Sequence, residues 1–223
     1  WHIYKELSDN LHAGFDIDDI QLAIQKNIFN LILNLKNSLE LIHLNKTFKI
    51  CIKGIAYKDI DKLNNSNSNN YKDVYFNLID LGIRDPENSP EDNKNIIHNL
   101  DFDPTTNNIN YADLTKTLFY ESFTDKKISY CSQFDEIQQK FTNKFKSGVV
   151  SPINLYGTPF GFLCIGIKEI NEISKNDEQL IATFTDCIAE YIRLRYIFKE
   201  VSKNLKVVVL SDKGKKNQYI DKV

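Results

Sequence analysis

Residues 147–167 have the sequence SGVVSPINLYGTPFGFLCIGI, and this stretch decides the class of fold. Two mostly apolar segments, 148–155 and 160–167, flank the turn sequence Tyr156-Gly157-Thr158-Pro159, a pattern typical of a β-hairpin. The apolar residues of the second segment are Phe160, Phe162, Leu163, Cys164, Ile165 and Ile167. Because this segment is apolar on both faces, we predict that it is a central strand of a sheet.

Residues 17–42 predict an α-helix, because apolar residues recur at spacings of three and four along one face. These residues are Ile17, Ile20, Ile24, Ile28, Leu31, Leu35, Leu39 and Ile42. Asp16 is a suitable N-cap for the helix. Alternation of apolar and polar residues predicts a strand over 48–53, and the apolar run 74–79 predicts a second strand. The alternating residues of the first strand are Phe48, Ile50 and Ile52 against Lys49 and Lys53.

Two polar segments, 61–70 and 84–110, have too few apolar residues to be packed, so we predict loops that are the least ordered part of the chain. Between these loops and the hairpin, the pattern predicts a helix over 111–123, a short strand over 127–133 and a short helix over 135–145.

A long helix is expected to begin near Asp177 and Glu178, where negative charge suits the N-terminal end of the helix dipole. Apolar residues then follow at alternating spacings of four and three, the a/d pattern of a coiled coil. This row consists of Leu180, Phe184, Cys187, Tyr191, Leu194, Phe198, Val201 and Leu205. A second row, Ile181, Ile188 and Ile192, is available to pack on the sheet. The run Val207–Leu210 predicts one more strand.

This order of elements predicts an α+β fold with an antiparallel sheet of about five strands. Long N- and C-terminal helices are expected on one face of the sheet, with shorter helices and loops on the other. We expect an N-terminal extension over 1–16 and a single domain over 17–200 with a long insertion at about 61–110. Residues 201–223 are expected to form the end of the last helix and a tail.

The composition excludes several classes of protein. The 223 residues include 28 Lys+Arg and 30 Asp+Glu, and this balance argues against direct nucleic-acid binding. No apolar stretch is long enough for a transmembrane helix, and we expect no membrane insertion. The four Cys stand singly, which favours free thiols and a cytoplasmic location. The absence of Met is compatible with a segment of a longer chain that carries an effector domain.

Residues 111–198 resemble the GAF domain, a small-molecule sensor module of signalling proteins, so the fold is expected to be GAF/PAS-like. Three motifs carry the resemblance, and they occur in the family's order. They are Ser147-Gly148-Val149-Val150-Ser151-Pro152-Ile153, then Gly157 followed by Gly161-Phe162-Leu163-Cys164-Ile165, and Asn176-Asp177-Glu178-Gln179-Leu180. The resemblance implies a non-catalytic domain that binds a small molecule between the sheet and the 84–123 segment.

The predicted lining of this pocket consists of Tyr75, Tyr111, Phe119, Tyr120, Tyr130, Cys131 and Ser151. Aromatic residues at such positions are more often core than ligand platforms, although tyrosine offers both a face and a hydroxyl. The sequence does not identify a cofactor. The four His residues are scattered, so no metal site is expected.

Several members of the family act differently, and the residues bear on each alternative. The cyclic-nucleotide members have an Asn-Lys pair, where this chain has Ile167-Lys168, and a Phe, where it has Ile173. Lys168 could still pair with Asp177, although Asp177 is expected mainly as an N-terminal helix acid. Cys131 lacks the neighbours of a bilin-binding Cys. The spacing of Cys51, Cys131 and Cys164 makes an enzyme of the methionine sulfoxide reductase kind the least favoured alternative.

The a/d row predicts a homodimer whose terminal helices relay the state of the pocket. The predicted interface residues are Leu180, Phe184, Tyr191, Leu194, Phe198 and Val201. A different function, a structural dimerisation domain whose pocket is vestigial or filled by its own side chains, would use the same helices. The two hypotheses differ only in whether a small molecule binds.

Overall fold

The computed structural model describes residues 17–57, 76–84, 115–136 and 145–220, and side chains in the last helix up to residue 199. The chain divides into two compact units, Phe29–Ala189 and a unit made of Trp1–Ile28 with Glu190–Val223. The boundaries between the two units lie within the two longest helices, at residues 28/29 and 189/190, where the apolar spacing of the sequence continues without a break. The expected loop over 61–70 and nearly all of the expected loop over 84–110 lie outside the described residues.

The unit Phe29–Ala189 contains a five-stranded antiparallel sheet. Its strands are β1 (Phe48–Tyr57), β2 (Phe76–Arg84), β3 (Ser129–Cys131), β4 (Ser147–Leu155) and β5 (Thr158–Ile167). Their order in the sheet is β2-β1-β5-β4-β3, so the predicted central strand lies between β1 and β4 as expected. The α+β class and the antiparallel sheet are confirmed.

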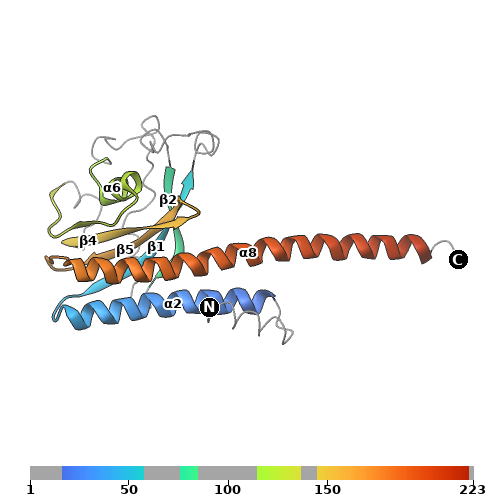
Figure 1. Cartoon of the computed structure of the whole chain (residues 1–223), viewed down its shortest axis with the longest axis horizontal. Helices are drawn as coiled ribbons and strands as arrows, with labels where there is room; N and C mark the ends of the chain where they lie inside the picture. The colour runs from blue at the N-terminus through green and yellow to red at the C-terminus, as the bar shows by residue number, and fades with distance from the viewer. Residues whose placement is uncertain (1–16, 58–75, 85–114, 137–144, 221–223) are drawn as a thin grey trace. The chain divides into compact units, whose positions relative to one another are not determined.

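Three helices are described: α2 (Ile17–Ile42), α6 (Leu118–Asp125) and α8 (Lys175–Ile220). Within the sheet-containing unit, the parts of α2 and α8 that belong to it lie along one face of the sheet, and α6 lies on the other (Figure 1). The burial of α2 follows the predicted stripe, with Ile32 in place of Leu31. Ile42, at the end of the stripe, is exposed.

The predicted helix over 111–123 begins later than expected. Helix α6 starts at Leu118, because the side chain of Thr117 is an N-cap and accepts a hydrogen bond from the backbone N–H of Tyr120. Lys126, at φ 54°, ends the helix in the left-handed conformation. An N-cap at Thr117 starts the helix there, whereas the spacing of apolar residues alone is equally compatible with a helix that begins at residue 111.

The prediction of a strand at Val207–Leu210 is wrong, because α8 continues as a helix to Ile220. Valine in a helix costs only a few tenths of a kcal/mol per residue. Extending an existing helix adds one backbone hydrogen bond for each residue, whereas a strand needs a neighbour. With 46 residues, α8 extends for roughly 70 Å at about 1.5 Å per residue.

The hairpin turn is shorter than predicted. Leu155 pairs directly with Thr158, so only Tyr156 and Gly157 form the turn. Both have positive φ, 53° and 80°, which is the requirement of a two-residue type I′ turn. Thr158 belongs to β5, and the sequence could not assign it because Thr-Pro suits both a turn and the first residues of a strand.

We expect Gly157→Ala to destabilise the sheet by about 1–2 kcal/mol, because a Cβ is disfavoured at positive φ. Apart from Gly157 itself and its two chain neighbours, no atom lies within 4 Å of the site of that Cβ, so the loss reports backbone strain. Urea unfolding measures the change. Tyr156→Asn is the matched control and should be neutral or stabilising, since Asn tolerates the left-handed region. Equal losses in both variants would contradict the assignment of the turn.

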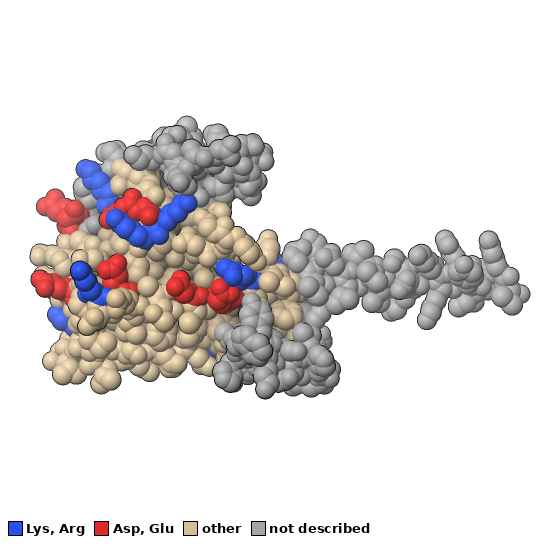
Figure 2. Space-filling model, viewed as in Figure 1, with Lys and Arg blue, Asp and Glu red and all other residues tan. Residues whose placement is uncertain are grey.

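The surface of the described residues carries charges of both signs. On the face drawn in Figure 2, basic and acidic side chains are interspersed over the sheet-containing unit. This pattern agrees with the near balance of charge in the sequence. Among the described residues, no helix combines the length and apolar character that crossing a membrane requires.

Candidate functional site

The face of the sheet beneath α6 is the candidate site, and the strand register shows which residues lie on it. Cys164 of β5 pairs with Cys51 of β1 and with Val150 of β4, so the three side chains share one face. These residues belong to one buried cluster. Its members are Cys51, Leu78, Leu118, Phe119, Phe123, Phe134, Phe145, Val150, Phe162 and Cys164.

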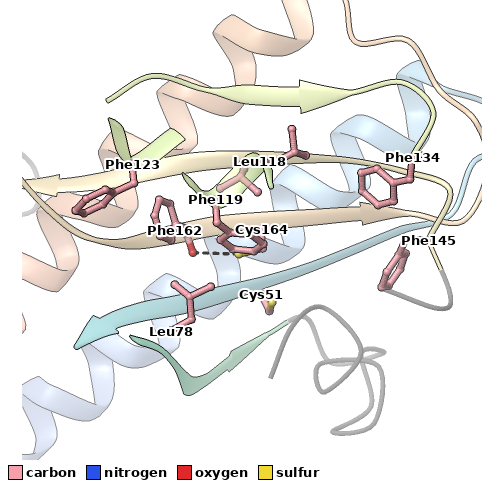
Figure 3. Packing of buried hydrophobic residues seen from close by; sticks show 10 residues of the cluster. Cys51, Leu78, Leu118, Phe119, Phe123, Phe134, Phe145, Phe162 and Cys164 are labelled. Atoms are coloured by element: carbon pink, nitrogen blue, oxygen red, sulfur yellow. Dashed lines mark hydrogen bonds between the residues drawn. The ribbon is translucent and has the colours of Figure 1, made fainter. Parts of the chain in front are cut away.

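Helix α6 covers the centre of this cluster with Leu118, Phe119 and Phe123 (Figure 3). The ring of Phe119 meets that of Phe162 edge to face, with centroids 5.4 Å apart and planes at 86°. This geometry places the positive edge of one ring against the negative face of the other. The aromatic side chains of α6 and β5 therefore fill the centre of the face by packing against each other.

Two glycines allow further rings to lie against the backbone of the sheet. A Cβ at Gly148 would lie 2.8 Å from the ring of Phe134, and a Cβ at Gly166 would lie 2.7 Å from that of Phe145. Gly148 and Gly166 pair with each other across β4 and β5. The absence of a side chain at Gly148 and Gly166 thus leaves room on β4 and β5 for the rings of Phe134 and Phe145.

Two lysines also lie on this face, and the sequence analysis did not include them in the site. Lys49 and Lys53 of β1 have the same alternation as Cys51, and Lys53 pairs with Phe162. Their exposures are 7% and 1%. Both residues have interaction partners in the structure. The alternation of Lys49 and Lys53 with apolar residues does not show whether their face is covered, and only the tertiary structure shows that it is.

The structure brings together three of the seven predicted lining residues. Phe119 is buried in the cluster, and Tyr120 and Cys131 pack against it. Tyr75 and Tyr111 lie outside the described residues or side chains. Burial raises the pKa of the Cys131 thiol, which donates to the carbonyl of Gln133 at 3.0 Å.

Tyr130 and Ser151 lie on the opposite face of the sheet, so their placement in the pocket is wrong. Tyr130 pairs with Val149, which precedes the cluster residue Val150 and therefore faces the other way. Ser151 is also out of phase with Val150, and its Oγ lies 2.8 Å from Oγ1 of Thr185 in α8. Alternation along a strand shows which residues share a face, but not which face is directed toward α6, and no sequence motif assigned the faces of β3 and β4.

Helix α8 carries two rows of side chains with different surroundings. Ile181, Thr185 and Ile188 are buried against the sheet-containing unit. Beside them, Leu180 and Phe184 are half-buried and Cys187 is exposed. In the other unit, Tyr191 and Phe198 are half-buried.

Leu194 differs from the other predicted interface residues, because it is only 5% exposed within the single chain. Val201 belongs to the part of α8 whose side chains are not described. Replacing Leu194 by a charged residue would therefore disturb the unit to which it belongs, whether or not a dimer forms.

Among the described residues, no group of three or more His, Cys, Asp or Glu side chains is arranged to hold a metal ion. No family model matches this chain, and no curated protein matches it. Similar solved structures exist. The GAF domain of Acinetobacter phosphoenolpyruvate-protein phosphotransferase is 10% identical over 81% of this chain and 92% of that chain, with a TM-score of 0.46.

Two further solved structures are similar to this chain. The GAF domain of a two-component sensor histidine kinase from Bacillus halodurans is 16% identical over 76% of this chain and 96% of that chain, with a TM-score of 0.45. A type II free methionine-R-sulfoxide reductase from Thermoplasma acidophilum is 12% identical, with coverages of 76% and 94% and a TM-score of 0.45. This likeness to sensor domains and to an enzyme concerns the fold alone.

The partner of Asp177 is not the predicted Lys168, which is exposed. Oδ1 of Asp177 lies 3.0 Å from Nε2 of His43, at the end of α2. Oδ2 accepts from the backbone N–H and the hydroxyl of Ser174, both at 2.8 Å. The hydroxyl oxygen of Ser174 in turn accepts from the N–H of Asp177, which completes a capping box.

These contacts determine the ionisation of Asp177, whose exposure is 1%. Burial opposes the charged carboxylate, but the hydrogen bonds from Ser174 and the imidazole of His43 outweigh it and lower the pKa of Asp177. A single carboxylate therefore joins the end of α2 to the beginning of α8. The sequence identified Asp177 as a helix acid but could not identify a partner so distant in the chain.

Proposed function

We propose that this protein is a non-catalytic sensory or regulatory domain, which binds a small molecule on the α6 face and transmits its state through paired terminal helices. The observation that carries the proposal is the pattern of buried and partly exposed side chains along α8. One row, represented by Ile181 and Ile188, is buried, while the a/d row beside it remains partly open in the single chain. The helix continues to Ile220, and only its first part belongs to the unit with the sheet.

The a/d row favours a second copy of the chain as the partner that packs against α8. Leu180, Phe184, Cys187 and Tyr191 follow the spacing by which identical helices interlock side chains in a coiled coil. A helix that packs on its own domain alone needs a single apolar stripe. The open row therefore supports a parallel homodimer along α8.

A second function, a structural dimerisation domain without a ligand, is favoured by the packing beneath α6. Phe119, Phe123 and Phe162 are at most 4% exposed, and the first and last contact each other directly. Side chains of the domain itself thus occupy the centre of the face. A small molecule in the proposed site would have to contact the edge of the cluster, where Ile55, Tyr120 and Cys131 are partly buried.

We expect a small molecule to co-purify with the chain and to appear in its native mass spectrum but not in the spectrum of the unfolded protein. Tyr120→Ala should reduce its occupancy, because Tyr120 packs at the edge of the cluster. Tyr130→Ala is the matched control and should leave occupancy unchanged, since Tyr130 lies on the other face and is 50% exposed. Equal occupancy in both variants would contradict a site beneath α6, and a purified chain with no bound molecule would favour the structural function.

The parallel dimer predicts a specific disulfide under mild oxidation. On the two-fold axis of a parallel pair, Cys187 of each copy faces its counterpart, so copper-phenanthroline treatment should give a covalent dimer on non-reducing gels. Cys187→Ser should abolish the product. The control is Cys187→Ser combined with Asp186→Cys, which moves the exposed thiol about 100° around the helix and should cross-link far less.

Sedimentation supplies an independent check at the same concentrations. The wild-type chain is expected to be dimeric at tens of micromolar, and Phe184→Glu should shift it toward monomer. A monomeric wild-type chain, or equal cross-linking by Cys187 and by the cysteine at 186, would refute the parallel seam.

A further inference from the structure

Two cysteines face each other on the central strands of the sheet. Cys51 of β1 and Cys164 of β5 are direct partners in the antiparallel register. Such partners have Cα atoms about 4.5–5.5 Å apart, which lies within the separation of about 4.4–6.8 Å that a disulfide spans. Both thiols are free. Figure 3 shows them on neighbouring strands within the cluster that α6 covers.

The surroundings protect these thiols while the cluster is closed. Cys51 is 0% exposed and Cys164 is 1% exposed. Burial, followed by the interaction with Cys51, raises the pKa of Cys164 well above its ordinary value. Since the thiolate is the reactive form, burial and the raised pKa slow the oxidation of the pair while the cluster is closed. Cys187, by contrast, is exposed and has no described cysteine opposite it in its own chain.

We infer that Cys51 and Cys164 form a redox modification site, at which a peroxide converts the two thiols into a disulfide between β1 and β5. In the first step, one sulfur attacks the peroxide, the O–O bond breaks, and a sulfenic acid and one water form. In the second, the other sulfur displaces the hydroxyl group, which leaves as a second water after taking the thiol proton. Two thiols are oxidised, and one hydrogen peroxide molecule is reduced to two waters.

The consequence of this modification is a covalent link between the two strands at the centre of the sheet. The link closes a long loop that includes β2, α6 and β4. Neither a dimer nor a bound small molecule is needed for the two thiols to react.

The test uses the full chain with Cys131→Ser and Cys187→Ser, which leaves only the pair. Both replaced residues are partly or fully exposed, so the fold should be retained. After treatment with hydrogen peroxide, the protein is unfolded with an alkylating reagent and no reductant, then digested for mass spectrometry. We expect the number of alkylated thiols to fall from two to none. A cross-linked peptide containing Cys51 and Cys164 should appear, lighter by two hydrogen atoms than its parts.

Two further measurements complete the test. Reduction should restore both thiols, and the oxidised protein should unfold at higher urea concentration than the reduced one, because the link restrains the unfolded chain. In the wild-type chain, the same pair should be found despite the presence of Cys131 and Cys187. The inference is overturned if both thiols are still alkylated after a peroxide dose that fully oxidises wild-type Cys187, or if Cys51 and Cys164 are oxidised singly without cross-linking.

Discussion

Asp177→Ala is expected to lower the free energy of unfolding by about 3 kcal/mol. The substitution removes the capping box at the start of α8 and leaves His43 without the carboxylate 3.0 Å away. Both losses act where α2 and α8 meet within the sheet-containing unit. Urea unfolding at neutral pH measures the difference. Glu178→Ala is the matched control, because Glu178 is the exposed neighbour and should change stability by less than about 0.5 kcal/mol.

The dependence of this loss on pH identifies the ionised carboxylate as its cause. The folded pKa of Asp177 is lowered from an ordinary value of 3.8, so the unfolded chain binds more protons in this range. The contribution of the ionised group is therefore fully present above about pH 4 and is lost as the pH falls through the folded pKa. Wild type and Asp177→Asn should converge in stability at low pH. A constant difference between them down to that range would show that the charge is not responsible.

Phe162→Ala is expected to cost about 3–5 kcal/mol, the largest effect of any single substitution beneath α6. Phe162 is 0% exposed, pairs with Lys53 and Pro152 on the flanking strands, and meets Phe119 edge to face. Its removal leaves a cavity that the surrounding strands cannot close, because each is held by its neighbours. Urea unfolding followed by circular dichroism measures the loss.

Two further variants test whether the loss in Phe162→Ala comes from lost packing. Phe162→Leu retains much of the volume and should cost clearly less than the alanine variant. Tyr196→Ala, at a 60% exposed helical position, should be close to neutral. If Phe162→Ala cost no more than Tyr196→Ala, the centre of the face would not be packed as described, and an open pocket there would become the better description.

The sequence by itself determined the elements whose pattern is long or redundant. The hairpin of β4 and β5, the apolar stripe of α2 and the start of α8 were all predicted, because period and turn residues agree with each other locally. The doubly apolar β5 also indicated its central position correctly. The two rows of α8 were visible as two spacings, and the burial of Ile181 and Ile188 confirms the row assigned to the sheet.

Only the tertiary structure decided which side chains share a face and which distant residues meet. Tyr130 and Ser151 were assigned to the wrong face, since a shift of one residue in register reverses every side chain of a strand. Lys53 is buried because it shares a face with Cys51 and Phe162, on which the cluster beneath α6 packs. The contact of His43 with Asp177 and the pairing of Cys51 with Cys164 join residues more than a hundred positions apart. Such pairs depend on how the helices and strands are placed, and local pattern carries no information about that placement.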